Sequence, residues 1–160
     1  MREPQNPTAI KYQQLLTEMG IQTQVVEFEQ ATRTAQDAAD AIGCQVGQIV
    51  KSLIFRTKSG QGLLVLTSGS NRVDEKRVRE LVGEKLGKAD ADFVRTATGY
   101  AIGGVPPFGH ASQMLTYIDE DLLQYETIWA AAGTPNAVFS LTPDALVAHS
   151  SGQPAAVSEV

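Results

Sequence analysis

The sequence predicts an α/β fold in a single compact domain. Segments in which apolar and polar residues alternate, as in a strand, take turns along the chain with segments that carry an apolar stripe at helical spacing. A length of 160 residues fits one domain, and 42% hydrophobic residues supply a core of ordinary size. The pattern contains about six strands and five short helices, which favours a mixed sheet with helices packed on it.

The first half of the chain carries the clearest local signals. Thr34 and Asp37 have the spacing of a capping box, and Gly43 stands where that helix is expected to end. The stretch GLLVLT is apolar on both faces and predicts a central strand. The expected elements are a helix over residues 7–19, a strand over 24–28, a helix over 34–42, and strands over 49–56 and 62–67.

The second half continues the alternation. Asp74 and Thr142 are capping residues for two further helices, and Pro143 takes the favoured first helical position. From His149 onward no periodic pattern is left, so a disordered tail is expected. The remaining expected elements are a helix over residues 89–97, a strand over 114–118, a helical turn over 119–123, and strands over 127–132 and 137–141.

Composition excludes several classes of protein. No apolar run approaches the roughly 18 residues of a membrane-spanning helix, and the N-terminal MREPQNPT lacks the apolar core of a signal peptide. A cytoplasmic protein without a membrane partner is therefore expected. The single cysteine, Cys44, excludes an internal disulfide framework and a zinc site built from cysteines.

Charge is spread unevenly along the chain. The net charge is −5, yet all 13 Lys and Arg residues lie between Arg2 and Arg95, and residues 100–160 carry six acidic residues and no Lys or Arg. Basic residues are densest over 72–95. This segment is either a face that meets a phosphate backbone or a solvated helix surface. The candidate nucleic-acid-binding residues in it are Arg72, Lys76, Arg77 and Arg79.

The strand over residues 49–56 carries a lysine in an unusual place. Alternation puts Lys51 on the same face as Ile49, Leu53 and Phe55, the more apolar of the two faces. A lysine is rarely buried without a partner, and burial lowers its pKa while a nearby anion restores it. Lys51 is therefore a candidate functional residue. The alternative is a lysine whose stem is half-buried and whose ammonium reaches the sheet edge.

A loop rich in glycine and proline follows the helix over 89–97. The stretch TGYAIGGVPPFGH contains Gly103, Gly104, Pro106 and Pro107 within five residues. Glycine lets backbone come close to a ligand, and proline makes the loop rigid. Such a loop is suited to hold an anion or a developing oxyanion with its N–H groups. The alternative is a tight structural turn.

Familiar catalytic patterns are absent from the sequence. His110 and His149 are the only histidines, and there is no Gly-x-Ser-x-Gly elbow, P-loop or His pair at metal-ligand spacing. The acidic residues over 119–121 fit a capped helix start better than a cation site. Neither a metal nor a cofactor is expected, and no side chain is an obvious general base. Lys51 and the glycine loop together are suited to bind a carbonyl, carboxylate or phosphate.

Several stretches in this order and spacing resemble the YbaK/prolyl-tRNA synthetase-associated editing domain family. They are IVKSLIF (49–55), GLLVLTSGSNRVDEKRV (62–78), TGYAIGGVPPFG (98–109), and IDEDLL with WAAAGTPNAVFSLTPDAL (118–123 and 129–146). The resemblance covers residues 21–148, which leaves residues 1–20 as an N-terminal helix and 149–160 as the tail. It implies a mixed, barrel-like sheet.

The resemblance also implies hydrolysis of the ester that joins a wrong amino acid to tRNA, here by a free-standing protein. The expected substrate is proline tRNA that carries Cys, Ala or another small amino acid. The family lysine matches Lys51, and the family G-x-x-x-P loop matches Gly103 to Pro107. In some members a hydroxyl of the terminal ribose assists the attacking water, so no protein base is needed. The expected catalytic residues are Lys51, Gly103 and Gly104, and the expected substrate-binding residues are Ser52, Val105, Pro106, Pro107 and Gly133.

Two positions depart from the family pattern. Ser52 stands where the alanine-editing branch carries Asn, and GTPN (133–136) lacks a histidine that several branches use. The amino acid and the tRNA therefore stay open. The expected partners are mischarged tRNA and an aminoacyl-tRNA synthetase, and a monomer and a dimer both fit.

Two other functions fit the same residues. A noncatalytic module for tRNA ends or small nucleotides would use the same pocket without shortening the life of an ester. A hydrolase with His110 as its base is the third interpretation.

Overall fold

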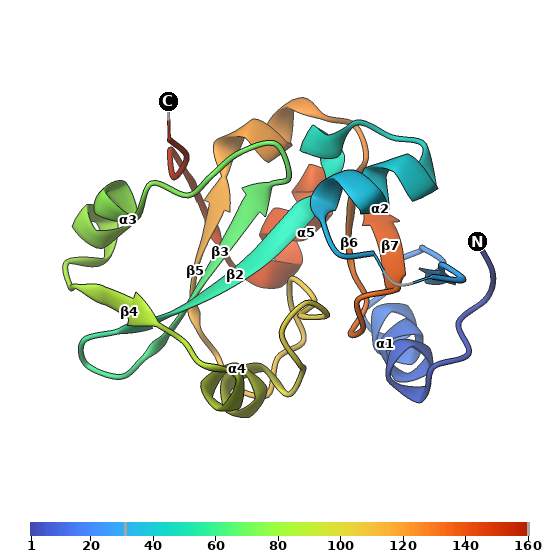
Figure 1. Cartoon of the computed structure of the whole chain (residues 1–160), viewed down its shortest axis with the longest axis horizontal. Helices are drawn as coiled ribbons and strands as arrows, with labels where there is room; N and C mark the ends of the chain where they lie inside the picture. The colour runs from blue at the N-terminus through green and yellow to red at the C-terminus, as the bar shows by residue number, and fades with distance from the viewer. Residues whose placement is uncertain (31, 160) are drawn as a thin grey trace.

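The computed structural model describes residues 1–30 and 32–159 as two β-sheets with helices packed around them (Figure 1). One sheet has the strand order β4-β2-β3-β5-β8 and the other has the order β1-β7-β6. The strands are β1 (Val26–Glu27), β2 (Val50–Thr57), β3 (Gly62–Ser68), β4 (Leu86–Lys88), β5 (Leu115–Asp119), β6 (Ile128–Ala131), β7 (Ala137–Leu141) and β8 (Gln153–Ala155). The helices are α1 (Pro7–Glu18), α2 (Ala35–Ile42), α3 (Glu75–Val82), α4 (Ala91–Thr98) and α5 (Pro143–Ser150), with 3₁₀ helices η1 (Val46–Gln48) and η2 (Glu120–Gln124).

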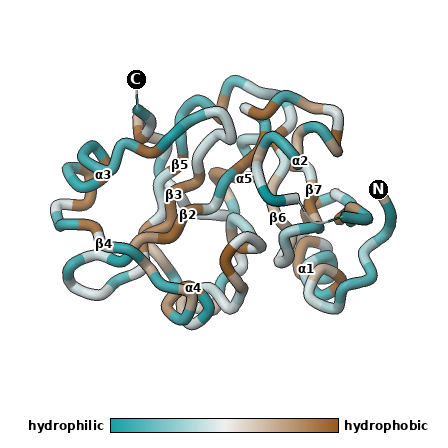
Figure 2. Tube along the Cα trace, in the orientation of Figure 1, coloured by the Kyte–Doolittle hydropathy of each residue, from teal (hydrophilic) through white to brown (hydrophobic). Residues whose placement is uncertain are grey.

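Strand β3 is central, as its two apolar faces predict. It pairs antiparallel with β2 and parallel with β5. Leu64 and Leu66 face the main core, whereas Leu63 and Val65 pack on the other side with Val78 of α3. Figure 2 shows hydrophobic residues gathered on β2 and β3, while α3 at the margin is largely hydrophilic. This sheet is therefore covered on both faces, as a mixed α/β arrangement requires.

Side-chain caps set the helix starts where the sequence predicts them. Thr34, Asp74 and Thr142 each accept a hydrogen bond from a backbone N–H in the first turn of α2, α3 and α5. Gly43 and Gly99 end α2 and α4 in the left-handed conformation, with φ of 85° and 84°. These local signals fix where α2 begins, and the start of α2 forms part of the cavity described below.

The two sheets meet at the start of β2. Ile49 forms a parallel bridge with Trp129 of β6, whereas only residues 55–57 of β2 pair with β4. Within the described part of the chain, residues 51–54 therefore have no strand paired on that edge. The expected α/β domain with mixed sheets is confirmed. Its strands do not close into a barrel, because pairing between the two sheets stops after this one bridge.

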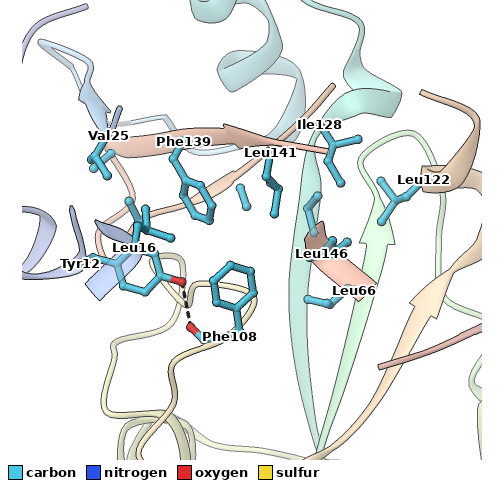
Figure 3. Close-up of a cluster of buried hydrophobic side chains, with 14 of the residues drawn as sticks. Tyr12, Leu16, Val25, Leu66, Phe108, Leu122, Ile128, Phe139, Leu141 and Leu146 are labelled. Atoms are coloured by element: carbon cyan, nitrogen blue, oxygen red, sulfur yellow. Dashed lines mark hydrogen bonds between the residues drawn. The ribbon is translucent and has the colours of Figure 1, made fainter. Parts of the chain in front are cut away.

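The main core lies between the two sheets and α1 (Figure 3). Tyr12 of α1 is buried, and its ring lies 5.6 Å from that of Phe139. Its Oη donates a hydrogen bond to the backbone oxygen of Phe108 at 2.9 Å, drawn as a dashed line in Figure 3. Helix α1 therefore packs into the same core as the sheets and anchors the loop that follows α4.

The expectation of a disordered tail over residues 149–160 is wrong for the part that the structure describes. His149 lies in the last turn of α5, β8 pairs parallel with β5, and Val157 is fully buried. Ser158 forms a bridge with Val73. The segment is ordered by its contacts with β5 and with Val73. A strand of three residues is too short to show a periodic sequence pattern. Strand β4 escaped prediction for the same reason.

No helix within residues 1–30 and 32–159 is both long enough and apolar enough to cross a membrane.

Candidate functional site

A cavity of about 850 Å³ lies where β2, β6, the start of α2 and the glycine loop come together. Most of its wall is apolar and includes Leu53, Val105 and Trp129. Its charged lining residues are Lys51 and Arg33. A concave, mostly apolar pocket with a few polar groups is the usual form of a site for a small ligand.

Lys51 lies in β2 opposite Thr67 of β3, and its side chain is half-buried. Its Nζ donates a hydrogen bond to the backbone oxygen of Asn71 at 2.5 Å. Burial lowers the pKa of the Lys51 ammonium, the nearby Arg72 guanidinium lowers it further, and the carboxylate of Asp119 raises it. An ammonium has three N–H donors. Lys51 therefore keeps donors for a ligand after its bond to Asn71.

The two adjacent glycines of the loop have different surroundings. Gly103 has a φ of 93° and lines the cavity together with Val105. Gly104 is buried, and a Cβ added there would lie 2.7 Å from the Cα of Thr134. The Gly104 N–H donates to the backbone oxygen of Ala101 at 3.1 Å. In this conformation the Gly104 N–H is therefore engaged within the loop, and the loop residues that line the cavity nearby are Gly103 and Val105.

The rest of the loop is held from behind the cavity. Pro106 and Pro107 are buried and lie outside the cavity lining. His110 Nε2 lies 2.6 Å from the backbone oxygen of Pro106, to which it donates because a carbonyl only accepts. Burial lowers the pKa of His110, which favours this neutral donor. His110 and Tyr12 thus hold the loop through the backbone carbonyls of Pro106 and Phe108.

Of the two remaining substrate-binding candidates, one lies at the cavity. Ser52 is part of the lining. Gly133 is buried outside it, where a Cβ would meet the side chains of Thr8 and Tyr100. The neighbour that reaches the cavity from this loop is Pro135.

The four basic candidates are divided between two places. Arg72 is close enough to Lys51 to lower the pKa of the lysine. Lys76 and Arg79 line a separate shallow cleft on α3 that also includes Lys85. Arg77 forms an ion pair with Asp74, with 3.5 Å between Nε and Oδ2. Only Arg72 therefore belongs to the surroundings of Lys51.

Sequence reasoning missed Arg33, Trp129 and Asp119. Arg33 directly precedes the cap of α2 and is exposed at the cavity, and its place beside a predicted helix start was the available signal. Trp129 lies in β6 and faces the same space. Asp119 lies at the end of β5, and the next residue begins η2, so its sequence pattern is that of a cap.

The model of the aminoacyl-tRNA editing domain matches residues 29–148. The chain belongs to this family. It is 35% identical to the uncharacterized protein YwhH of Bacillus subtilis, over 81% of this chain and 83% of that protein. It is 27% identical to EbsC of Enterococcus faecalis, a candidate Cys-tRNA(Pro)/Cys-tRNA(Cys) deacylase, over 75% and 74%.

A solved structure extends the likeness over the whole fold. The crystal structure of a candidate trans-editing enzyme for prolyl tRNA synthetase has a TM-score of 0.92 and 46% sequence identity, and the match covers 98% of this chain and 100% of that one. These relatives support aminoacyl-tRNA deacylation as the general activity of this editing domain.

The cavity of the editing domain offers hydrogen-bond donors and cationic side chains. No Asp, Glu or His occurs in its lining among the described residues. Within the same residues no group of three or more His, Cys, Asp or Glu side chains is placed to hold a metal ion. The groups at hand are suited to bind phosphate and carbonyl oxygens.

Proposed function

We propose that this editing domain is a free-standing deacylase that hydrolyses the ester between a small, wrongly attached amino acid and its tRNA. The proposed substrate is proline tRNA that carries Cys, Ala or another small amino acid. The observation that carries the proposal is the mostly apolar cavity that Lys51, Gly103 and Val105 line together. The proposed place of action is the cytoplasm, with a prolyl-tRNA synthetase as the source of the substrate.

The charges at the cavity suit the acceptor end of a tRNA. Arg33 lines it, Lys51 lies within it, and Arg72 stands next to Lys51. Positive side chains bind the phosphates of the last nucleotides, which fixes the position of the ester without reading the sequence. Trp129 and Leu53 supply apolar surface for the amino-acid side chain or the terminal base.

Hydrolysis then needs a water and a place for negative charge. The water oxygen bonds to the ester carbonyl carbon, and the oxyanion that forms is held by N–H groups of Gly103 and Val105. When the tetrahedral intermediate breaks down, the ribose oxygen leaves with a proton and the free amino acid departs. Because the described lining holds no carboxylate or histidine, the neighbouring ribose hydroxyl is the proposed proton relay: it accepts the proton that the water loses and passes its own proton to the leaving ribose oxygen.

A deacylation panel tests this function. Proline tRNA charged with Pro, Ala, Cys or Ser, and alanine and threonine tRNAs mischarged with Ser, are incubated with purified protein. We expect one or more mischarged esters to disappear faster than in buffer while Pro-tRNA survives. If every ester decays at its spontaneous rate, the deacylase proposal is contradicted.

Replacing His110 by alanine separates this mechanism from one with a histidine base. We expect kcat/KM to fall by less than about tenfold, because only one neutral hydrogen bond to the loop is lost. The melting temperature should fall as well, since His110 holds the buried Pro106 carbonyl. Loss of all measurable activity in a folded His110→Ala protein would instead assign the base to His110.

A further inference from the structure

Asp119 is a buried carboxylate outside the cavity wall. It is 1% exposed, and it accepts four hydrogen bonds from neutral donors. The donors are the backbone N–H of Ser68 at 3.0 Å, Nδ2 of Asn71 at 2.9 Å, Oγ of Ser158 at 2.9 Å and the backbone N–H of Asp121 at 3.0 Å. A buried charge is tolerated only with such a complete set of partners. The network joins β3, β5, the loop after β3 and the C-terminal segment.

The network leads directly to Lys51. Asn71 donates from Nδ2 to Asp119, and its backbone oxygen accepts the hydrogen bond from Lys51 Nζ. Asn71 is therefore held by Asp119 through its side chain, and the main-chain oxygen of Asn71 holds the Lys51 ammonium. Nδ2 of Asn71 also donates to Asp121 at 2.7 Å. Ser68, the last residue of β3, also binds Asp119 and lies opposite Val50, the residue directly before Lys51.

The C-terminal segment closes the same loop from outside. The backbone N–H of Asp74 donates to the Val157 oxygen at 2.8 Å, and the N–H of Glu159 donates to the Arg72 oxygen at 2.8 Å. Ser158 reaches Asp119 with its hydroxyl. Residues 157–159 therefore restrain the main chain of the loop that carries both Asn71 and Arg72.

We propose that Asp119 is a positioning residue for Lys51. Asp119 acts through Asn71, and residues 157–159 complete the hydrogen-bond network that holds this loop. Asp119 does not touch the substrate in this role. Its carboxylate fixes the Asn71 carbonyl, and this carbonyl fixes the ammonium at the cavity. The inference rests on the proposed function of Lys51 in deacylation.

The test uses two single variants and their combination. Asn71→Ala keeps the main-chain oxygen but loses the anchor to Asp119, and Asn71 is half-buried at the surface, so this variant is expected to fold. Asp119→Asn keeps the shape of the side chain but removes its negative charge and replaces one accepting oxygen by an NH₂ group, which cannot accept a hydrogen bond. Glu126→Gln, an exposed carboxylate on another loop, is the matched control. We expect kcat/KM to fall about tenfold in either single variant, no further in the double variant, and not at all in the control.

A second readout is independent of deacylation. The acylation rate of Lys51 by a dilute amine-reactive reagent is measured by peptide mass spectrometry on the folded proteins. We expect several-fold faster labelling of Lys51 in Asn71→Ala and Asp119→Asn, and a smaller increase in Ser158→Ala. The labelling of Lys11, an exposed lysine on α1, should stay unchanged.

Other results overturn the positioning role. Unchanged Lys51 labelling in Asn71→Ala, with or without a lower melting temperature, would show that Asp119 only stabilises the fold. Additive losses of kcat/KM in the double variant would show that Asp119 does not act through Asn71. If the wild-type protein cleaves no ester, the proposed function fails, while the labelling experiment still decides whether Asp119 positions Lys51.

Discussion

Replacing Lys51 by methionine is expected to lower kcat/KM for deacylation by about 100-fold, the effect of losing one charge-assisted interaction in a partly desolvated site. Methionine keeps the apolar stem that packs in β2 and removes the ammonium. The carbonyl of Asn71 then loses its partner, and the cavity keeps only Arg33 as a charged lining residue. Initial rates at several tRNA concentrations should show that binding and rate both suffer.

Lys11→Met is the matched control for this change. Lys11 is exposed on α1, whereas Lys51 is half-buried at the cavity, so the control should deacylate like the wild type. A Lys51→Met protein that is folded and cleaves esters at the wild-type rate would remove Lys51 from the mechanism.

Gly104→Ala is expected to damage both stability and activity. The added Cβ would lie 2.7 Å from the Cα of Thr134 and 2.8 Å from the backbone oxygen of Gly133, and neither backbone atom can rotate away. The two loops must move apart, which shifts Gly103 and Val105 at the cavity wall. Overpacking of this kind costs about 1–3 kcal/mol of unfolding free energy. A displaced oxyanion donor lowers kcat by about 100-fold or more.

Gly87→Ala is the control for Gly104→Ala. A Cβ at Gly87 in β4 would lie 3.5 Å from the Arg56 oxygen, which is ordinary contact. Thermal unfolding and single-turnover deacylation of both variants separate a general loss of fold from displacement of the loop. Wild-type stability and rate in Gly104→Ala would show that the contact between the two loops is unimportant.

Much of this arrangement follows from local sequence signals. Thr34, Asp74 and Thr142 cap helices because their side chains accept hydrogen bonds at the spacing that capping requires. The apolar run in β3 has no polar face, so it had to be a central strand. Lys51 stood out for the same kind of reason, since a charge on an apolar face needs a partner, and the structure supplies Asn71.

What escaped prediction depends on contacts between distant segments. Residues 153–159 are ordered by contacts with β5 and with the loop near Val73, and no periodic pattern in their own sequence predicts these contacts. Gly104 and Gly133 read as ligand-facing glycines, but they are glycines because segments pack closely there. Asp119 looked like a helix cap and is one, but three further hydrogen bonds reach it from residues 39 to 51 positions away in the chain.

The most direct test of the account is the lifetime of one mischarged ester at saturating protein. Binding of proline tRNA mischarged with Cys or with Ala is measured first. The ester is then followed in a single turnover at a protein concentration above the dissociation constant. We expect wild-type protein to shorten the lifetime of at least one of these esters, and Lys51→Met to shorten it far less at the same occupancy. Saturable binding with an ester lifetime equal to that in buffer would contradict the account and identify a noncatalytic tRNA-end binding module.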